Sequence, residues 1–272
     1  MMALIRKESI VVLCEQRYLT QNQPADFVRA LRQYNTQVSL VIVEEFVEMP
    51  LLDVDLVVAR GRSHALLEVL EQFEANDIPT INTSGAIAGV VDKWHMSQVF
   101  QAQEISAPRT WLVPVTELYE HVREFPVVIK PVFGDNGRDV TLLHDREQLE
   151  RLVWKEPFAL LQTFVAGDSL DLKLYGISDS VWAVRKPGPL LDCAGMASDM
   201  PAEKLSPSSD LYRLARRCAD IFGLSLYGVD CILSAQGPQV IEINDFPNYT
   251  QVGNAGDRIA EFVLNTIRSA CS

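Results

Sequence analysis

Residues 240–249 read VIEINDFPNY, a strand pattern that contains two polar side chains shortly before a proline. Because successive side chains of a strand point to opposite faces, Glu242 and Asn244 share one face, while Ile241 and Ile243 pack into the core. A carboxylate and an amide side by side at the end of a buried strand indicate a ligand site. The alternative is the solvent-facing polar side of a hairpin.

A second carboxylate is expected beside this pair. The stretch LYGVDCIL at residues 226–233 is also a strand pattern and contains Asp230, and the turn SAQGP at residues 234–238 folds the two strands together. Unpaired carboxylates at one place repel each other and lose hydration, and a divalent cation with oxygen ligands removes that cost. We favour magnesium binding by Asp230, Glu242 and Asn244, because the polar residues stop at these positions instead of alternating along the strand.

A lysine and two glycines upstream suggest contact with an anion. Residues 127–140 read VVIKPVFGDNGRDV, and Lys130 ends an apolar strand, so its ammonium group is expected to emerge beside the sheet. Gly134 and Gly137 allow the backbone to approach a ligand closely and to turn N–H groups toward it. On these residues alone, phosphate binding and a plain hairpin turn are equally supported. The phosphate-loop pattern GxxxxGK[ST] does not occur in the chain.

Residues 171–186 read DLKLYGISDSVWAVRK, which predicts a hairpin with charged side chains on both strands. Asp171 and Lys173 share one strand face, and Arg185 and Lys186 follow on the return strand. A cationic clamp for phosphate or carboxylate groups is one interpretation. Taken alone, the pattern is explained more simply by a cross-strand ion pair on an exposed hairpin, which is worth roughly a few tenths of a kcal/mol.

Composition limits the classes of partner. The chain has 272 residues, of which 48% are hydrophobic and 22% charged, and its net charge is −12. Such a chain repels polyanions, so neither nucleic acid nor an anionic membrane surface is an expected partner. The five cysteines are scattered without a CxxC pair, which is typical of a reducing cytoplasm and argues against a disulfide framework or a zinc site. No stretch approaches the roughly 20 apolar residues that a membrane span needs.

The pattern of elements changes near residue 85. Before it, continuous apolar strands alternate with amphipathic helices, which predicts a small open α/β domain with a parallel sheet. After it, antiparallel hairpins with interspersed helices predict an α+β body, and residues 187–209 are expected to form a loop. In the first domain, Arg60 and Arg62 follow a strand. They could reach a substrate across the domain cleft, although a plain turn is the simpler interpretation.

Six stretches, in order and spacing, resemble the ATP-grasp enzymes and most closely the RimK-type carboxylate–amine ligases. They read INTSGAIAGVVDKWHMSQVF, VVIKPVFGDNGRDV, LLQTFV, DLKLYGISDSVWAVRK, YGVDCIL and VIEINDFPNY, and they cover roughly residues 80–265. One stretch alone is weak evidence, but six in the right order are specific. The resemblance implies a pre-ATP-grasp α/β domain at residues 1–85, followed by a two-lobed ATP-grasp fold with a small lid subdomain at residues 86–165 and a C-terminal subdomain at residues 166–272.

The resemblance also implies roles for the matching positions. Lysines would contact the phosphates of ATP, a glycine-rich loop would close over them, and a hinge strand would hold adenine through backbone groups. The implied nucleotide-binding residues are Lys93, Lys130, Phe133, Gly134, Asp135, Asn136, Gly137, Gln162, Thr163, Phe164, Val165 and Lys173. The implied catalytic residues are Lys173 and Arg185, and the implied metal ligands are Asp230, Glu242 and Asn244. Gln162 departs from the family, because many relatives carry an acidic residue there.

The function that the resemblance implies is ligation of a carboxylate to an amine through an acyl-phosphate intermediate. ATP and two Mg²⁺ ions, or Mn²⁺ in their place, would be required, and the substrates would be small-molecule or peptide carboxylates and amines. The stretch after the clamp hairpin lacks the Arg- and Asn-containing segment of the RimK-type ligases, so their particular substrates do not carry over. We expect a cytoplasmic protein, and a homo-oligomer is left open.

Two other functions are compatible with the pattern. The stretches GLSLYGVD and INDFPNY also resemble the inositol-phosphate kinases, so an ATP-dependent kinase of a polyol phosphate is the alternative. The net charge of −12 argues against a highly phosphorylated substrate. A non-catalytic nucleotide-binding regulator is disfavoured, because all three candidate metal ligands and both candidate phosphate-binding lysines are present.

Overall fold

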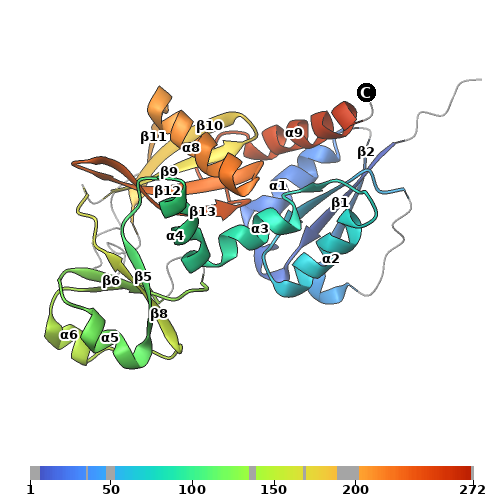
Figure 1. The fold of residues 1–272 in the computed structure, drawn as a ribbon. Helices are drawn as coiled ribbons and strands as arrows, with labels where there is room; N and C mark the ends of the chain where they lie inside the picture. Colours follow the sequence, from blue (N-terminus) through green and yellow to red (C-terminus); the bar gives the residue numbers. More distant parts are fainter. Residues whose placement is uncertain are drawn as a thin grey trace, which may run out of the picture.

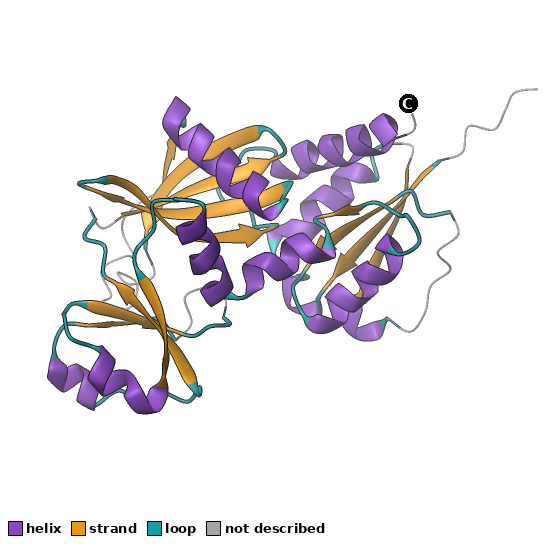
Figure 2. Cartoon of the chain, in the orientation of Figure 1, coloured by secondary structure: helices purple, strands orange, loops and turns teal. Residues whose placement is uncertain are grey.

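A computed structural model describes residues 7–34, 36–46, 53–134, 139–167, 170–188 and 202–270. These residues form three sheets with helices packed against them, and the predicted combination of an open α/β part with an α+β body is confirmed (Figure 1). Figure 2 shows the three sheets as separate groups of strands joined by helical segments. Within the described part of the chain, no helix combines the length and apolar character needed to cross a membrane.

The first sheet is parallel and has the order β2-β1-β3-β4. Its strands are β1 (Glu8–Cys14), β2 (Thr36–Ile42), β3 (Leu56–Arg60) and β4 (Thr80–Ile81). Alternate residues of β1 pack on opposite sides, Ile10 against helix α1 (Asn22–Leu31) and Val11 against helix α2 (His64–Glu74). Both faces are therefore covered in the middle of the sheet, which is why β1 and β3 are buried along most of their length.

The second sheet is antiparallel and has the order β5-β8-β6-β7. It contains β5 (Thr110–Pro114), β6 (Val127–Lys130), β7 (Thr141–Leu143) and β8 (Phe158–Thr163), with the short helices α5 (Leu118–His121) and α6 (Arg146–Glu150) packed on it. Helices α3 (Ser84–Val91) and α4 (Lys93–Ala102) lead from the first sheet to this one. Short 3₁₀ helices lie at Gln16–Tyr18 (η1), Val43–Glu45 (η2) and Val115–Glu117 (η3).

The third sheet has the order β11-β10-β9-β12-β13 and is antiparallel. Its strands are β9 (Leu170–Ile177), β10 (Ser180–Pro187), β11 (Glu203–Leu205), β12 (Leu226–Ser234) and β13 (Gly237–Asp245). Both predicted hairpins are present, and β9 pairs with β12 to join them. Strand β11 lies inside the predicted loop at residues 187–209 and pairs with β10, so that loop is interrupted by a strand.

The apolar face of the third sheet packs against helix α8 (Ser209–Phe222). Ser208 caps the start of α8 by accepting a hydrogen bond from the backbone N–H of Leu211, and Gly223 ends it with a φ of +70°. The opposite face of the sheet carries Glu242 and Asn244, and on the same face Tyr175 and Ile177 pack in the core cluster that contains residues of α1 and α9. The candidate site therefore shares its face of the sheet with part of the core.

Two sets of contacts hold the third sheet in position relative to the first sheet. Helix α9 (Ala255–Ala270) packs beside α1, where the backbone of Asp26 comes so close to Gly256 that a Cβ there would lie 2.7 Å from it. Asn82, after β4, donates to the carbonyl of Leu226 at 2.8 Å and accepts from the N–H groups of Ser225 and Leu226 at 2.8 and 3.0 Å. These contacts hold the end of the first sheet at the start of β12 (Figure 1).

Candidate active site

The register of the third sheet brings the sequence-predicted metal ligands together. Asp230 on β12 lies directly opposite Glu242 on β13, and on its other side it lies opposite Lys173 on β9. Asn244 lies two residues beyond Glu242 and opposite Gly228. Directly opposite residues of an antiparallel pair point to the same face, so these polar side chains gather on one side of the sheet.

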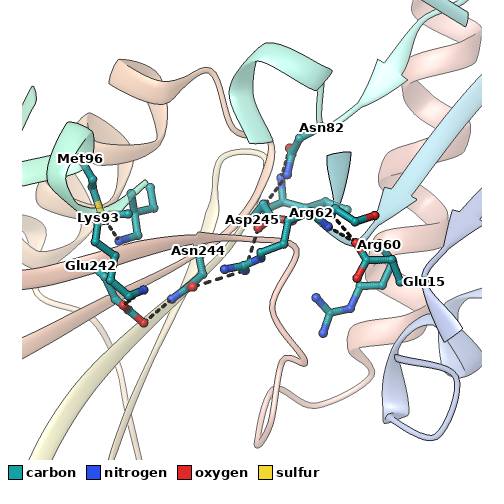
Figure 3. A network of polar contacts seen from close by, with 12 residues as sticks. Glu15, Arg60, Arg62, Asn82, Lys93, Met96, Glu242, Asn244 and Asp245 are labelled. Carbon is teal, nitrogen blue, oxygen red and sulfur yellow. Dashed lines mark hydrogen bonds and ion pairs between the residues drawn. The ribbon is translucent and has the colours of Figure 1, made fainter. Parts of the chain in front are cut away.

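Helix α4 places a lysine beside this group. The outer edge of β13 is hydrogen-bonded to the segment that contains α4. The N–H of Val240 donates to the carbonyl of Ser106 at 2.7 Å. The N–H of Ile243 donates to Met96 Sδ at 3.4 Å (Figure 3). Asp92 caps α4 by accepting from the N–H groups of Trp94 and His95. Lys93 is the first residue of this helix, and Figure 3 shows its side chain pointing to β13.

Each carboxylate of the group is paired with a lysine. Lys93 Nζ lies 2.9 Å from Glu242 Oε2, and Lys173 Nζ lies 2.6 and 2.7 Å from the two oxygens of Asp230. Asn244 Nδ2 donates to Glu242 Oε1 at 3.1 Å. The two carboxylates therefore lie side by side with one lysine on each outer side. The sequence predicted the members of this group but not their pairing.

The lysine–carboxylate pairs oppose the effect of burial on the pKa values of their members. Burial alone would raise the pKa of Glu242, but the ammonium of Lys93 and the amide of Asn244 hold it well below its usual range. Burial alone would lower the pKa of Lys173, but the Asp230 carboxylate raises it above its ordinary value. Burial raises the pKa of Asp230, and Lys173 opposes that shift while the neighbouring Glu242 adds to it. At neutral pH Glu242 is therefore ionised, and the ammonium groups of Lys93 and Lys173 lie against the two carboxylates.

Lys130, at the end of β6, is hydrogen-bonded to a neutral side chain and not to a carboxylate. Its side chain is buried, and Nζ donates to Gln162 Oε1 at 3.1 Å, while Gln162 Nε2 donates to Thr110 Oγ1 at 2.9 Å. Burial lowers the pKa of Lys130 to about 8, with Lys93 acting in the same direction and Glu242 against it. The side chain of Gln162, which the resemblance assigned to the adenine hinge, thus orients Lys130, the candidate phosphate-binding lysine.

The lowered pKa of Lys130 predicts proton uptake when a polyanion binds. At pH 9 the ammonium is largely deprotonated in the free protein, and a bound phosphate raises its pKa and restores the proton. Calorimetric titration with a non-hydrolysable ATP analogue, in two buffers of different ionisation enthalpy, should show close to one proton taken up at pH 9 and almost none at pH 6.5. Equal proton uptake at the two pH values would contradict this assignment.

The remaining nucleotide-binding candidates lie along the ends of β6 and β8. Thr163 ends β8, where its N–H donates to the carbonyl of Arg109 at 2.9 Å, and the exposed Phe164 and the half-buried Val165 follow it. Phe133 and Gly134 follow β6, and Phe133 is 62% exposed. Asp135, Asn136 and Gly137 lie outside the described residues, as do residues 189–201 of the predicted loop at residues 187–209.

The clamp hairpin places Lys186, and not Arg185, on the site face. Lys186 lies opposite Asp171, whereas Arg185 lies opposite Leu172, a core residue of the other face. Burial raises the pKa of Asp171 to about 6, and Lys173 and Lys186 oppose that shift, which places both ammonium groups near this carboxylate. The sequence-predicted Arg185 is therefore not brought together with Asp230. The pairing of β10 with β9 across the turn at residues 178–179 places Lys186 on the face of Lys173.

Substitution of the two neighbouring cations should separate their roles. Lys186→Met should lower the rate of ADP formation by about tenfold or more, because the site would lose a cation on the face where we expect the phosphates to bind. Arg185→Met serves as the matched control, and we expect a change of less than about threefold. A larger loss in Arg185→Met than in Lys186→Met, measured by steady-state ADP release, would show that the strand register does not determine the role.

Arg62 of the first domain also reaches this site. One of its terminal nitrogens lies 2.8 Å from Asp245 Oδ1 and 3.5 Å from Asn244 Oδ1 (Figure 3). Arg62 lies in the turn after β3, and its contact with the end of β13 was not predicted from the sequence. No local sequence signal indicated the contact, because the partners are 182 residues apart.

The donor set fits a hard divalent cation. Within the described ranges, no group of three or more His, Cys, Asp or Glu side chains is arranged to hold a metal ion. The candidate set contains two carboxylates and one amide, and such oxygen donors suit Mg²⁺, which usually takes one or two carboxylates and completes its shell with water and substrate phosphates. The ammonium groups of the lysines that contact Asp230 and Glu242 would have to move away from these side chains when the metal binds.

Comparison with known proteins agrees with this geometry. The model of the RimK-like ATP-grasp domain matches residues 90–267. A probable alpha-L-glutamate ligase 2 of Hahella chejuensis is 30% identical over 215 residues, which cover 73% of this chain and 69% of that protein. A probable alpha-L-glutamate ligase of Marinobacter nauticus is 30% identical over 238 residues, which cover 80% of this chain and 77% of that protein.

Solved structures share the fold. An ATP-grasp RimK domain protein from Sphaerobacter thermophilus matches with a TM-score of 0.73 and 20% identity, covering 94% of this chain and 99% of that one. A D-alanine–D-alanine ligase from Bacillus anthracis matches with a TM-score of 0.70 and 13% identity, covering 97% of this chain and 98% of that one.

Proposed function

The chain belongs to the RimK-like ATP-grasp family, and from this premise we propose that it is an ATP- and magnesium-dependent ligase that joins a carboxylate to an amine through an acyl-phosphate. ATP-dependent, ADP-forming carboxylate–amine ligation is the activity that the family match and the relatives support. The acyl-phosphate intermediate, the particular substrates and the residue roles are our proposal. Because the relatives are named glutamate ligases, L-glutamate is the first amine to test.

The pairing of each carboxylate with a lysine carries the proposal. Lys93 and Lys173 pair with Glu242 and Asp230, so these ammonium groups and carboxylates are already held at contact distance. A bound metal–triphosphate complex would replace these contacts with two others. The lysines would then contact the phosphates, and the carboxylates would contact the metal. Such an exchange keeps every buried charge neutralised, which a site that held only one sign of charge could not do.

The residues then have distinct tasks. Asp230, Glu242 and Asn244 would hold Mg²⁺, which when bound supplies charge neutralisation at the phosphates. Lys93 and Lys130 would bind the phosphates of ATP, and the segment of Thr163, Phe164 and Val165 would hold the adenine. Lys173 and Lys186 would face the phosphoryl group in transfer. These cations stabilise the transition state by position and charge, because phosphoryl transfer requires little covalent participation by the protein.

The reaction proceeds in two balanced steps. A carboxylate oxygen of the first substrate attacks the γ-phosphorus, and ADP leaves with the electron pair of the broken P–O bond. The neutral amine of the second substrate then attacks the acyl carbon, inorganic phosphate leaves, and the amine nitrogen loses a proton to give the amide. One ADP and one phosphate are formed for each amide bond.

Hydroxylamine provides a test that does not require the natural amine. Protein, ATP and Mg²⁺ are incubated with single carboxylates and hydroxylamine, which attacks an acyl-phosphate and gives a hydroxamate that is detected by its iron(III) colour. We expect hydroxamate and ADP in equal amounts with some carboxylates, and then amide formation when L-glutamate replaces hydroxylamine. Phosphate transfer to a polyol in place of hydroxamate formation would favour a kinase and contradict the proposal.

A further inference from the structure

The turn after β3 is built around a buried carboxylate. Glu15 is 3% exposed and accepts hydrogen bonds from the backbone N–H groups of Arg62 and Ser63, the latter at 2.6 Å. Gly61 has a φ of +155°, and a Cβ at that position would lie 2.5 Å from Glu15 Oε1. Only glycine fits between this carboxylate and the turn. The backbone of Arg62 is therefore held firmly at the end of the first sheet.

From this anchored backbone, the side chain of Arg62 crosses to the end of β13 and is largely buried there (Figure 3). Its terminal nitrogen lies 2.8 Å from Asp245 Oδ1, and Asp245 is 1% exposed. A carboxylate this deeply buried needs a cation, so the ion pair fixes the position of the guanidinium. The same nitrogen lies 3.5 Å from Asn244 Oδ1, beside the candidate metal ligands.

The side-chain amide of Asn244 is thereby restrained at both ends. Its Nδ2 donates to Glu242 Oε1 at 3.1 Å, and its Oδ1 faces the guanidinium of Arg62. A carbonyl oxygen has two lone pairs, so Oδ1 can accept from Arg62 with one and bind a cation with the other. Groups that orient a metal ligand in this way raise metal affinity without touching the metal.

We propose that Arg62 is a positioning residue that fixes the amide oxygen of Asn244 for magnesium binding and so makes the first domain part of the metal site. This inference rests on the proposed function, because it takes Asn244 as a metal ligand. It gives the first sheet a task in nucleotide binding: Glu15 holds the turn, Asp245 holds the guanidinium, and Arg62 connects both to Asn244.

The test measures Mn²⁺ binding by electron paramagnetic resonance in the presence of a saturating non-hydrolysable ATP analogue. Arg62→Lys keeps a cation for Asp245 but lacks the planar fork that serves two partners. We expect its Kd for Mn²⁺ to rise about tenfold or more, with a melting temperature close to that of the unsubstituted protein. Arg32→Lys, an exposed position at the end of α1, is the matched control and should leave the Kd unchanged.

A double substitution distinguishes positioning from a general structural role. If Arg62 acts through Asn244, then Arg62→Lys should weaken Mn²⁺ binding no further once Asn244 has been replaced by alanine. An equal weakening in both backgrounds, or an unchanged Kd in the single variant, would overturn the proposal and leave the proposed function intact. Failure of the unsubstituted protein to bind Mn²⁺ with the nucleotide would overturn both.

Discussion

Replacement of Glu242 by glutamine should lower ADP formation by about 10²- to 10³-fold. The substitution keeps the size of the side chain and its ability to accept from Lys93, but it removes the charge on which a divalent cation depends. ADP release in the presence of hydroxylamine and a reactive carboxylate measures the loss. Some stability should be lost with the Lys93–Glu242 ion pair, but the fold should be retained, because the apolar contacts of the third sheet with α8 are unchanged.

Glu71→Gln is the control for this experiment. Glu71 is exposed on helix α2, away from the third sheet, and its replacement should leave the rate within about twofold of the unsubstituted value. A Glu242→Gln variant that kept the full rate would show that Glu242 does not hold the metal. Unfolding of the variant, seen in its circular dichroism, would show instead that the Lys93–Glu242 pair is structural.

Replacement of Lys130 by methionine should separate activity from stability. We expect ADP formation to fall by about 10²-fold or more, because a phosphate-binding cation is lost in a site with little water. The melting temperature should stay the same or rise. Burial lowers the pKa of Lys130 from 10.5 to about 8, so the charged form costs about 3 kcal/mol relative to an exposed lysine. Methionine has a similar shape and carries no such cost.

The pH dependence of the melting temperature checks the sign of this effect. The folded state holds the Lys130 proton less tightly than the unfolded state, so its penalty is fully present below pH 8 and disappears as the pH rises toward 10.5. The gain in stability of Lys130→Met should shrink over the same range. Lys155→Met, at an exposed position, is the control. Full activity in Lys130→Met would contradict phosphate binding by Lys130.

The sequence was informative wherever the evidence was local. Alternation along residues 240–249 placed Glu242 and Asn244 on one face, and the hairpin turn before them brought Asp230 to Glu242, as the strand register shows. The RimK-type resemblance rested on six short stretches in order, and the family match confirms it. Such features depend on neighbouring residues and on a strand period of two, which can be read without a structure.

Other parts of the site depended on register and on distant contacts. Arg185 and Lys186 are adjacent, and only the pairing of β10 with β9 decides which of them faces Asp171. Gln162 contacts Lys130 from a different strand, and Arg62 reaches Asn244 across 182 positions of sequence. The sequence also did not reveal that the lysines and the carboxylates pair with each other, because the lysines were assigned to phosphate groups and the carboxylates to the metal.

The central claim is that the oxygen donors of β12 and β13, with the lysines around them, hold one metal–triphosphate complex. The dependence of nucleotide binding on the metal tests this claim most directly. Titration calorimetry with a non-hydrolysable ATP analogue, with and without Mg²⁺, measures it without any knowledge of the substrates. The account predicts binding that tightens about tenfold or more when Mg²⁺ is present, and a loss of that gain in Glu242→Gln. Absence of nucleotide binding, or an affinity that is the same with and without Mg²⁺, would contradict it.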